Sequence, residues 1–166
     1  MMTIELFLRK LVDADVESMY IMLGNSLSSY QTVNNSSSKN FQLIIDRNVV
    51  EDYVKSDVYL CQVVEINSEI AGRPAGSSKT EVNSEHSCSL GDFYIEEIVV
   101  DSCYRRKSIG SFLLRGIPKD RLRAIAVDTP LINQQAITFY KQSGFVKVLG
   151  LSEEFYKTWT RMSKPV

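Results

Sequence analysis

The sequence predicts a single α/β domain in which strands and helices alternate along the chain. Apolar runs rich in β-branched residues, such as Val58–Ile66 and Phe93–Val100, have the character of strands, whereas Asn133–Ser143 has helical spacing. The 166 residues are enough for one domain with a substantial core. Because no internal repeat or domain boundary interrupts the chain, residues 1–166 are expected to fold as one unit.

The amino-terminal part is predicted to form a strand followed by a helix. Thr3–Lys10 has strand character. Asp13 or Asp15 can cap a helix that runs to about Leu23, and Gly24 is expected to close it, because glycine commonly follows the last helical residue.

The middle of the chain is predicted to contain one helix and two strands. We expect a Ser- and Asn-rich loop over residues 25–40 and then a helix over Phe41–Lys55 with a break near Asn48. Two strands, Val58–Ile66 and Ile70–Ser77, and an exposed polar loop over residues 79–90 are expected to follow. A turn at Asn67–Glu69 separates the two strands. Pro74 is expected to break the second one, because proline has no N–H for the ladder.

The carboxy-terminal part alternates strand and helix most clearly. We expect a strand over Phe93–Val100, a short helix over Phe112–Ile117 and a strand over Leu122–Val127. A helix over Asn133–Ser143 and two strands, Phe145–Leu149 and Phe155–Met162, are expected to follow. Gly116 and Pro118 stop the short helix early.

Composition excludes several classes of protein. The chain is 44% apolar and 23% charged, which is ordinary for a soluble globular protein. A net charge of −1 argues against nucleic acid as a partner, since such binders carry a basic excess. No apolar run approaches the ~20 residues of a membrane span, so no membrane partner is expected.

The cysteines favour a reducing compartment and no metal. Cys61, Cys88 and Cys103 show no Cys-x-x-Cys spacing, and their odd number, without a signal peptide, favours the cytoplasm. His86 and Cys88 lie two residues apart, but no further ligand lies nearby in the sequence, so no metal site is expected.

A basic turn follows the strand Phe93–Val100. It carries three consecutive cations: Arg105, Arg106 and Lys107. Small residues, Ser108 and Gly110, then lead into an apolar segment of helical character. Backbone N–H groups at a helix N-terminus attract anions, and adjacent cations strengthen the attraction. The turn is therefore predicted to hold phosphate, although taken alone it also fits a solvated basic turn.

A second patterned segment begins at Asn133, which is a good helix N-cap. Ala136, Phe139 and Tyr140 fall at helical spacing and form one face. Gly144 stands where a helix ends in a left-handed residue, and the next strand follows it.

These two segments, in this order and with a strand between them, resemble motifs of the GNAT family of N-acetyltransferases. The first matches Gln/Arg-x-x-Gly-x-Gly/Ala as Arg105-Arg106-Lys107-Ser108-Ile109-Gly110. The second matches Asn-x-x-Ala-x-x-Phe-Tyr-x-x-x-Gly-Phe from Asn133 to Phe145. The resemblance covers about Phe93 to Met162. Ser108 departs from it, because the family usually has glycine there.

The resemblance implies a mixed central sheet of six to seven strands, flanked by about four helices, whose splayed central strands bind acetyl-CoA. It implies direct transfer of an acetyl group from acetyl-CoA to an amine in a ternary complex, without a metal. The residues that it assigns to the cofactor are Ile98, Val99, Val100, Arg105, Arg106, Lys107, Ser108, Ile109, Gly110, Ser111, Asn133 and Tyr140.

Three side chains are candidates for proton transfer. Glu96 and Glu97 point to opposite faces of their strand, and one of them is expected to act as general base, directly or through a water. The sequence does not choose between them, and Tyr94, on the face of Glu96 in a regular strand, is a lesser candidate. Tyr140 matches the tyrosine that protonates the leaving thiolate in many relatives. A backbone N–H near Ile98 or Val99 is expected to stabilise the oxyanion.

The acceptor amine stays open: a protein N-terminus, a lysine side chain, a polyamine and an amino sugar all fit. The regions expected to bind it are Asp13–Lys55 and Leu149–Phe155, and their candidate acids are Asp46, Glu51, Asp52, Glu153 and Glu154. Monomer and homodimer are both open. The alternative function is a catalytically silent acyl-CoA-binding sensor, supported by Ser108 and the short helix. A nucleotide-binding protein is disfavoured, because no Gly-rich loop with Gly-Lys-Ser/Thr is present.

Overall fold

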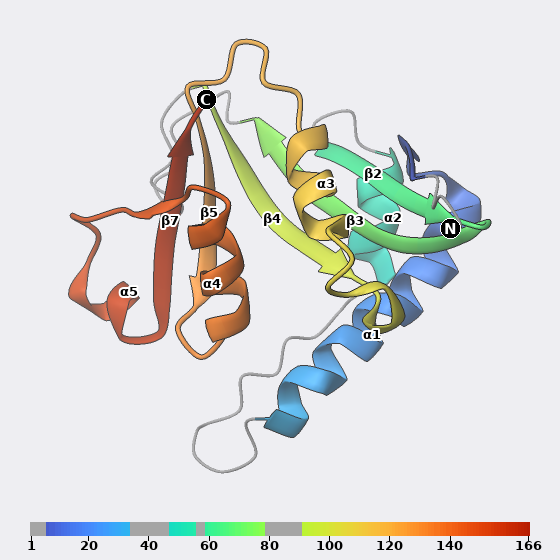
Figure 1. Cartoon of the computed structure of the whole chain (residues 1–166), viewed down its shortest axis with the longest axis horizontal. Coiled ribbons are helices and arrows are strands. Elements are labelled where there is room, and N and C mark those ends of the chain that lie inside the picture. The colour runs from blue at the N-terminus through green and yellow to red at the C-terminus, as the bar shows by residue number, and fades with distance from the viewer. Residues whose placement is uncertain (1–5, 34–46, 56–58, 79–90) are drawn as a thin grey trace. The chain divides into compact units, whose positions relative to one another are not determined.

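The computed structural model describes residues 6–33, 47–55, 59–78 and 91–166. Its seven strands form one sheet in the order β1-β2-β3-β4-β5-β7-β6, and Figure 1 labels most of the strands and the helices. The strands are Phe7–Lys10 (β1), Tyr59–Ile66 (β2), Glu69–Ser78 (β3), Asp92–Val100 (β4), Ala124–Pro130 (β5), Val146–Lys147 (β6) and Trp159–Pro165 (β7). The α-helices are Val16–Val33 (α1), Arg47–Lys55 (α2), Ile109–Gly116 (α3), Gln134–Gln142 (α4) and Glu153–Thr158 (α5). Since β4 pairs with β5 in parallel and β1 with β2 antiparallel, the sheet is mixed, and the expected fold class is confirmed.

The chain divides into two compact units, which are described separately. The first contains Met1–Ala75 and Ile98–Ile117, and the second contains Gly76–Glu97 and Pro118–Val166. Strands β3 and β4 run through both units.

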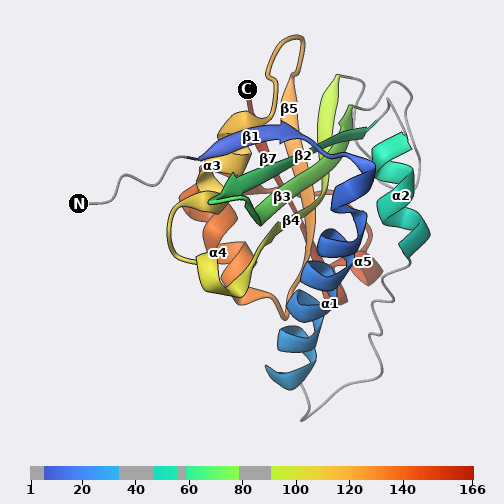
Figure 2. The same cartoon turned by 90° about the vertical axis from the view of Figure 1, so that its right-hand side faces the viewer.

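In the first unit, helices cover both faces of the sheet: α1 and α2 lie on one face and α3 on the other (Figure 2). Successive side chains of a strand point to opposite faces, so each strand contributes residues to both layers. Val63 packs with the residues of α1 and α2, whereas its neighbour Val64 packs with Ile109 and Leu113 of α3. Because both faces of this strand are buried, Val58–Ile66 has apolar residues at positions that point to either face.

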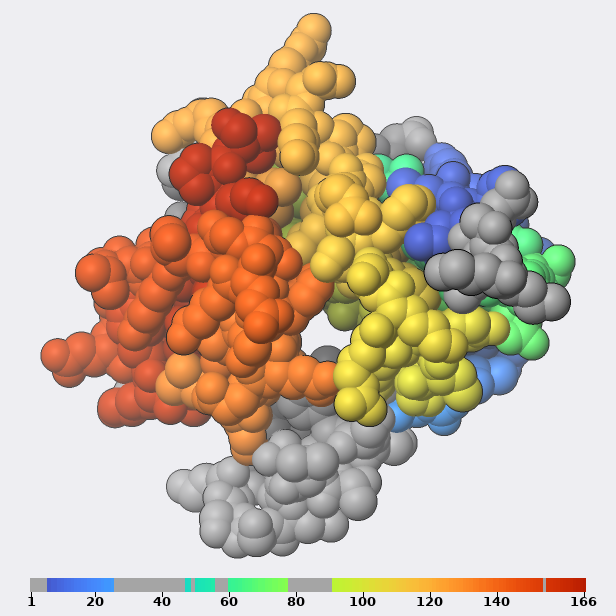
Figure 3. All heavy atoms as spheres, viewed as in Figure 1, coloured from blue at the N-terminus to red at the C-terminus, as the bar shows by residue number. Residues whose placement is uncertain are grey.

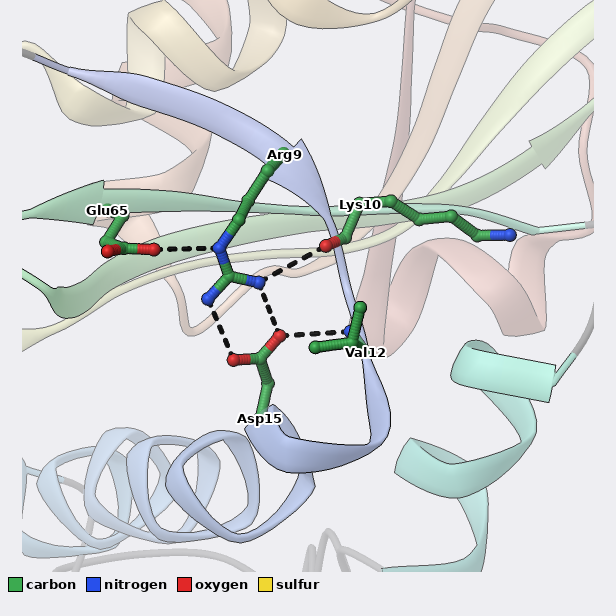
Figure 4. Close-up of polar contacts among 5 residues, drawn as sticks. All are labelled: Arg9, Lys10, Val12, Asp15 and Glu65. Carbon is green, nitrogen blue, oxygen red and sulfur yellow. Dashed lines mark hydrogen bonds and ion pairs between the residues drawn. The ribbon is translucent and has the colours of Figure 1, made fainter.

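An ion network joins β1 to the start of α1 and to β2 (Figure 4). The Arg9 guanidinium donates to both carboxylate oxygens of Asp15, at 2.6 and 2.9 Å, and to Glu65 at 2.7 Å. Asp15 also accepts from the Val12 N–H at 3.0 Å. These hydrogen bonds from Arg9 hold the pKa of Asp15 below its usual value, against the opposing effect of burial.

In the second unit, β5 and β7 form a ladder of seven antiparallel residue pairs, from Ala124–Pro165 to Pro130–Trp159. The short β6 pairs with β7 at its outer edge. Helix α4 begins at the predicted cap, since the Asn133 side chain accepts from the Ala136 N–H at 2.9 Å.

Helix α1 continues past its predicted end. It runs through Gly24 to Val33, so the prediction of a loop is wrong for residues 25–33. Glycine inside a helix costs about 1 kcal/mol, which the buried side chains of Met19, Met22 and Leu23 outweigh by packing against the sheet. Residues 34–46 lie outside the described part, and Asn48 lies inside α2 rather than at a break.

Two further predictions about elements are corrected. Pro74 does not break β3, which continues to Ser78 between two hydrogen-bonded neighbours and buries the proline ring completely. The segment from Phe155 begins in α5 instead of in the last strand, because the Ser152 hydroxyl caps the helix by accepting from the Phe155 N–H at 3.2 Å. The last strand starts only at Trp159.

The bounds of α3 and β6 differ from the predicted ones without changing the order of elements. Helix α3 begins at Ile109, three residues earlier than predicted, and ends at Gly116 as expected. Strand β6 is reduced to two residues of the predicted Phe145–Leu149. The turn at Asn67–Glu69 is confirmed, with Asn67 at φ 52° and Ser68 at φ 67°. The predicted loop over residues 79–90 lies outside the described residues.

Candidate active site

The ladder between β4 and β5 covers only part of both strands. It joins Asp92–Ile95 to Ala124–Val127, whereas β4 continues to Val100 and β5 to Pro130. The two candidate carboxylates, Glu96 and Glu97, follow the last paired residue of β4. Backbone groups of a strand beyond the end of a ladder can pair with an extended ligand.

The candidate residues of β4 differ in exposure. Glu96 is exposed and Glu97 is half-buried. The negative charge of Glu96 helps to raise the pKa of the Tyr94 phenol. Beyond them, Ile98 and Val100 pack against the α3 layer, whereas Val99 packs on the opposite face.

The basic turn is held by hydrogen bonds at its start. The Asp101 N–H donates to the Ala71 carbonyl at 2.9 Å, and the Asp101 carboxylate accepts from the Cys103 N–H at 2.8 Å. The Arg105 Nε donates to the Val100 carbonyl at 3.1 Å, and this hydrogen bond stabilises the turn. Arg106 and Lys107 are exposed, and Figure 3 shows their segment, in yellow, at the molecular surface.

Ser108 has a left-handed backbone, with φ 63° and ψ 10°, directly before the first residue of α3. Its carbonyl accepts the Phe112 N–H at 3.0 Å, which starts the helix, but its hydroxyl makes no capping hydrogen bond. The first N–H groups of a helix have no intrahelical acceptor, and in α3 they belong to Ile109, Gly110 and Ser111. The turn therefore has the donors and cations that an anion requires.

Tyr140 of α4 lies in an aromatic cluster. Its ring centroid is 5.2 Å from those of both Phe139 and Phe145, and only 5% of the residue is exposed. Gly144 follows the helix at φ 88°, the left-handed residue predicted there. Asn133 and Tyr140, the two residues of this motif that the resemblance assigns to the cofactor, thus also have structural roles as helix cap and core residue.

Sequence reasoning missed a buried polar network on β4, β5 and β7. Arg161 donates to both oxygens of Asp128, at 2.6 and 2.5 Å, and the Tyr94 hydroxyl donates to Asp128 at 3.1 Å. Burial is the main cause that raises the pKa of Tyr94, and the Asp128 charge adds to it. The predicted last strand, Phe155–Met162, contains Arg161, but its sequence does not identify a partner for that residue.

The candidate acids for the acceptor belong to different elements. Glu51 makes ion pairs with Arg47 and Lys55 along α2, and Asp52 and Glu153 are exposed. Asp46 and the side chain of Glu154 lie outside the described residues. Among the residues that the structure describes, no three His, Cys, Asp or Glu side chains cluster as they would around a metal ion. No helix in the described ranges is long and apolar enough to cross a membrane.

Comparison with known families decides the assignment. A profile described as "Acetyltransferase (GNAT) domain" matches residues 57–147, which is more than half of the chain. The chain belongs to the GNAT acetyltransferase family. A search of curated protein sequences finds no match.

Solved structures show the GNAT fold over the full length of the chain. An N-acetyltransferase (PaiA) from Thermoplasma acidophilum, in complex with coenzyme A, has 15% identity and a TM-score of 0.75, with 98% of this chain and 99% of that chain covered. The ribosomal-protein-S18-alanine N-acetyltransferase from Escherichia coli has 14% identity and a TM-score of 0.67, with 97% and 94% covered. A spermidine N-acetyltransferase variant from Vibrio cholerae has 20% identity and a TM-score of 0.65, with 96% and 93% covered.

Proposed function

We propose that this GNAT protein transfers an acetyl group from acetyl-CoA to a primary amine by direct attack in a ternary complex. The observation that carries the proposal is the basic turn, which combines exposed cations with a left-handed residue at the start of α3 in a chain of the acetyltransferase family. The coenzyme A complex of a structural neighbour supports the choice of co-substrate. The free thiols of Cys61 and Cys103 support the expected cytoplasmic location.

The basic turn is proposed to hold the pyrophosphate. Arg106 and Lys107 supply positive charge, and the N–H groups of Ile109, Gly110 and Ser111 supply donors. The backbone of Ile98–Val100 is proposed to pair with the pantetheine arm, because the described β4–β5 ladder ends at Ile95.

The chemistry requires one proton to leave the amine and one to reach the sulfur. The amine nitrogen attacks the acetyl carbonyl carbon, a C–N bond forms, and the C–S bond breaks with both electrons remaining on sulfur. Glu96 is proposed to take the proton from nitrogen, and its exposure supports it over the half-buried Glu97. Tyr140 is proposed to give a proton to the thiolate. A main-chain N–H near Ile98 or Val99 is proposed to stabilise the oxyanion.

Turnover with a panel of amines tests the proposal. Acetyl-CoA is mixed with spermidine, glucosamine, a peptide with a free N-terminal alanine, and an N-blocked peptide with an internal lysine, and released thiol is measured. We expect release with at least one amine and a loss of about 10²–10⁴ in kcat for Glu96→Gln, with a smaller loss for Glu97→Gln. Binding of acetyl-CoA without turnover of any amine would instead identify a silent acyl-CoA-binding module.

A further inference from the structure

The proposed mechanism does not use a buried polar cluster formed by Tyr94, Asp128 and Arg161. All three residues belong to the second unit and come from three adjacent strands, β4, β5 and β7. Asp128 and Arg161 are direct cross-strand partners, and the Arg161 guanidinium binds the carboxylate through two nitrogens. Only 3% of Arg161 is exposed. A buried bidentate pair of this kind fixes the orientation of both groups.

The cluster lies where the ladder between β4 and β5 ends. The last pair of the ladder is Ile95 with Val127, so Asp128 is the first residue of β5 beyond it. Tyr94 is next to Ile95 on β4, and its hydroxyl reaches Asp128 across this point. Glu96, the proposed base, lies two residues further along β4 and acts electrostatically on the Tyr94 phenol.

Asp128 determines what the Tyr94 hydroxyl can do. The Asp128 carboxylate accepts a hydrogen bond from the Tyr94 O–H, with 3.1 Å between the two oxygens. Burial and the Asp128 charge raise the pKa of Tyr94, so the phenol stays protonated at neutral pH and does not act as a base. A hydroxyl that donates its one proton to a fixed carboxylate can interact with a further group only as an acceptor. The Tyr94 oxygen is therefore an acceptor beside the proposed base.

We propose that the Tyr94 hydroxyl, oriented by Asp128 and Arg161, accepts a hydrogen bond from one N–H of the acceptor amine and makes the enzyme selective for primary over secondary amines. The inference rests on the proposed function. A neutral primary amine carries two N–H hydrogens. As the C–N bond forms, Glu96 removes one of them and the other stays hydrogen-bonded to Tyr94, so no proton passes through the tyrosine. A secondary amine has one N–H and cannot satisfy both groups.

The test compares each active amine of the panel with its N-methyl derivative, in the wild type and in Tyr94→Phe. In the wild type we expect kcat/KM for the primary amine to exceed that of the N-methyl amine. Tyr94→Phe is expected to lower kcat/KM about tenfold for the primary amine and less than twofold for the N-methyl amine. KM for acetyl-CoA is expected to stay within about twofold, since Tyr94 is not assigned to the co-substrate.

The matched control is Tyr156→Phe. The Tyr156 hydroxyl also makes a short hydrogen bond within the second unit, to the Val148 carbonyl at 2.6 Å, and it accepts from the Leu151 N–H at 3.3 Å. Its loss is expected to lower the melting temperature and to leave the ratio of primary to N-methyl rates unchanged. Steric exclusion of the methyl group is controlled in the same experiment, because Tyr94→Phe keeps the ring.

Each contrary outcome has one meaning. Equal losses for both amines in Tyr94→Phe, or no loss for either, would overturn the role of Tyr94 and leave the acetyltransferase proposal standing. If Tyr94→Phe does not fold, the wild type can still overturn the inference, because equal kcat/KM values for primary and N-methyl amines would contradict it. No thiol release by the wild type with any amine would overturn the proposed function, and the inference with it.

Discussion

Ser108 occupies a backbone conformation that glycine adopts far more easily. Its φ of 63° and ψ of 10° lie in the left-handed region, which costs an L-residue roughly 1–2 kcal/mol through the contact of Cβ with the following carbonyl. The family's usual glycine at this position therefore has a conformational reason, besides the close approach of phosphate. The turn keeps its shape with serine at the expense of stability.

Ser108→Gly is expected to stabilise the protein by about 1 kcal/mol, because glycine adopts this conformation without the Cβ contact. Urea unfolding followed by circular dichroism measures the change. Ser108→Ala is the matched control, since alanine keeps Cβ and loses only the hydroxyl, so its stability is expected to stay near that of the wild type. A gain of the same size in Ser108→Ala would show that backbone strain is not the cause.

The Asp15 carboxylate is expected to make stability depend on acid pH. Its pKa in the folded state lies below the unfolded value of about 4, mainly because of the hydrogen bonds from Arg9. The stabilisation is therefore complete above the unfolded pKa and is lost as the pH falls through the folded pKa. At neutral pH, we expect the free energy of unfolding of the wild type to exceed that of Asp15→Asn by about 1.5 kcal/mol. The expected difference is small because Arg9 is partly exposed to solvent.

Unfolding curves of both proteins from neutral pH down to about pH 2 measure this dependence. Asp52→Asn is the control, because Asp52 lies exposed on α2. A difference between the wild type and Asp15→Asn that persists unchanged at the lowest pH would contradict the assignment of the stabilisation to the carboxylate charge.

Single residues were predictable from the sequence where their role is local. Asn133 as a cap and Gly144 as a left-handed residue follow from the helix between them, and both are confirmed. The partnership of Asp128 with Arg161 was not predictable. The two residues are 33 positions apart, and only the antiparallel register of β5 and β7 brings them together. No fixed spacing in the sequence encodes such a pair.

Elements were predicted best where apolar periodicity and turn residues agree, as in β2, β4 and α4. Helix α1 shows where they disagree, because the glycine signal indicated an end and the burial of Met22 and Leu23 favoured continuation. Tertiary packing decided the outcome. In α5, the cap at Ser152 outweighed the strand-like pattern that follows it.

Two glycine substitutions test this account of α1 and β3. A Cβ at Gly24 would meet nothing within 4 Å, so Gly24→Ala is expected to raise stability by about 0.5–1 kcal/mol through helix propensity. A Cβ at Gly72 would lie 2.7 Å from the Val99 carbonyl oxygen, so Gly72→Ala is expected to lower stability by about 1–3 kcal/mol. Thermal unfolding of both variants measures whether each substitution raises or lowers stability. Lower stability in Gly24→Ala would argue against a continuous α1.

At the scale of the whole molecule, the residues assigned to function are divided between the two units. The basic turn and Ile98–Val100 belong to the first, and Glu96, Tyr94 and Tyr140 belong to the second. The sequence contained both motifs, because strand–turn–helix units carry local signals, and the resemblance of these motifs to the family implied the mixed sheet. It did not predict the exposure that separates Glu96 from Glu97, because exposure depends on the packing around β4 rather than on strand parity.

Thermal unfolding with and without acetyl-CoA tests the claim that the basic turn binds acetyl-CoA. The proteins are the wild type, Arg106→Glu and Arg115→Glu; the last makes the same charge change at the exposed far end of α3. At about 100 times the dissociation constant, the ligand adds about 2.7 kcal/mol, a rise of roughly 5–10 °C. We predict that rise in the wild type and Arg115→Glu and its loss in Arg106→Glu. No rise in the wild type, or an equal rise in Arg106→Glu, would contradict the claim.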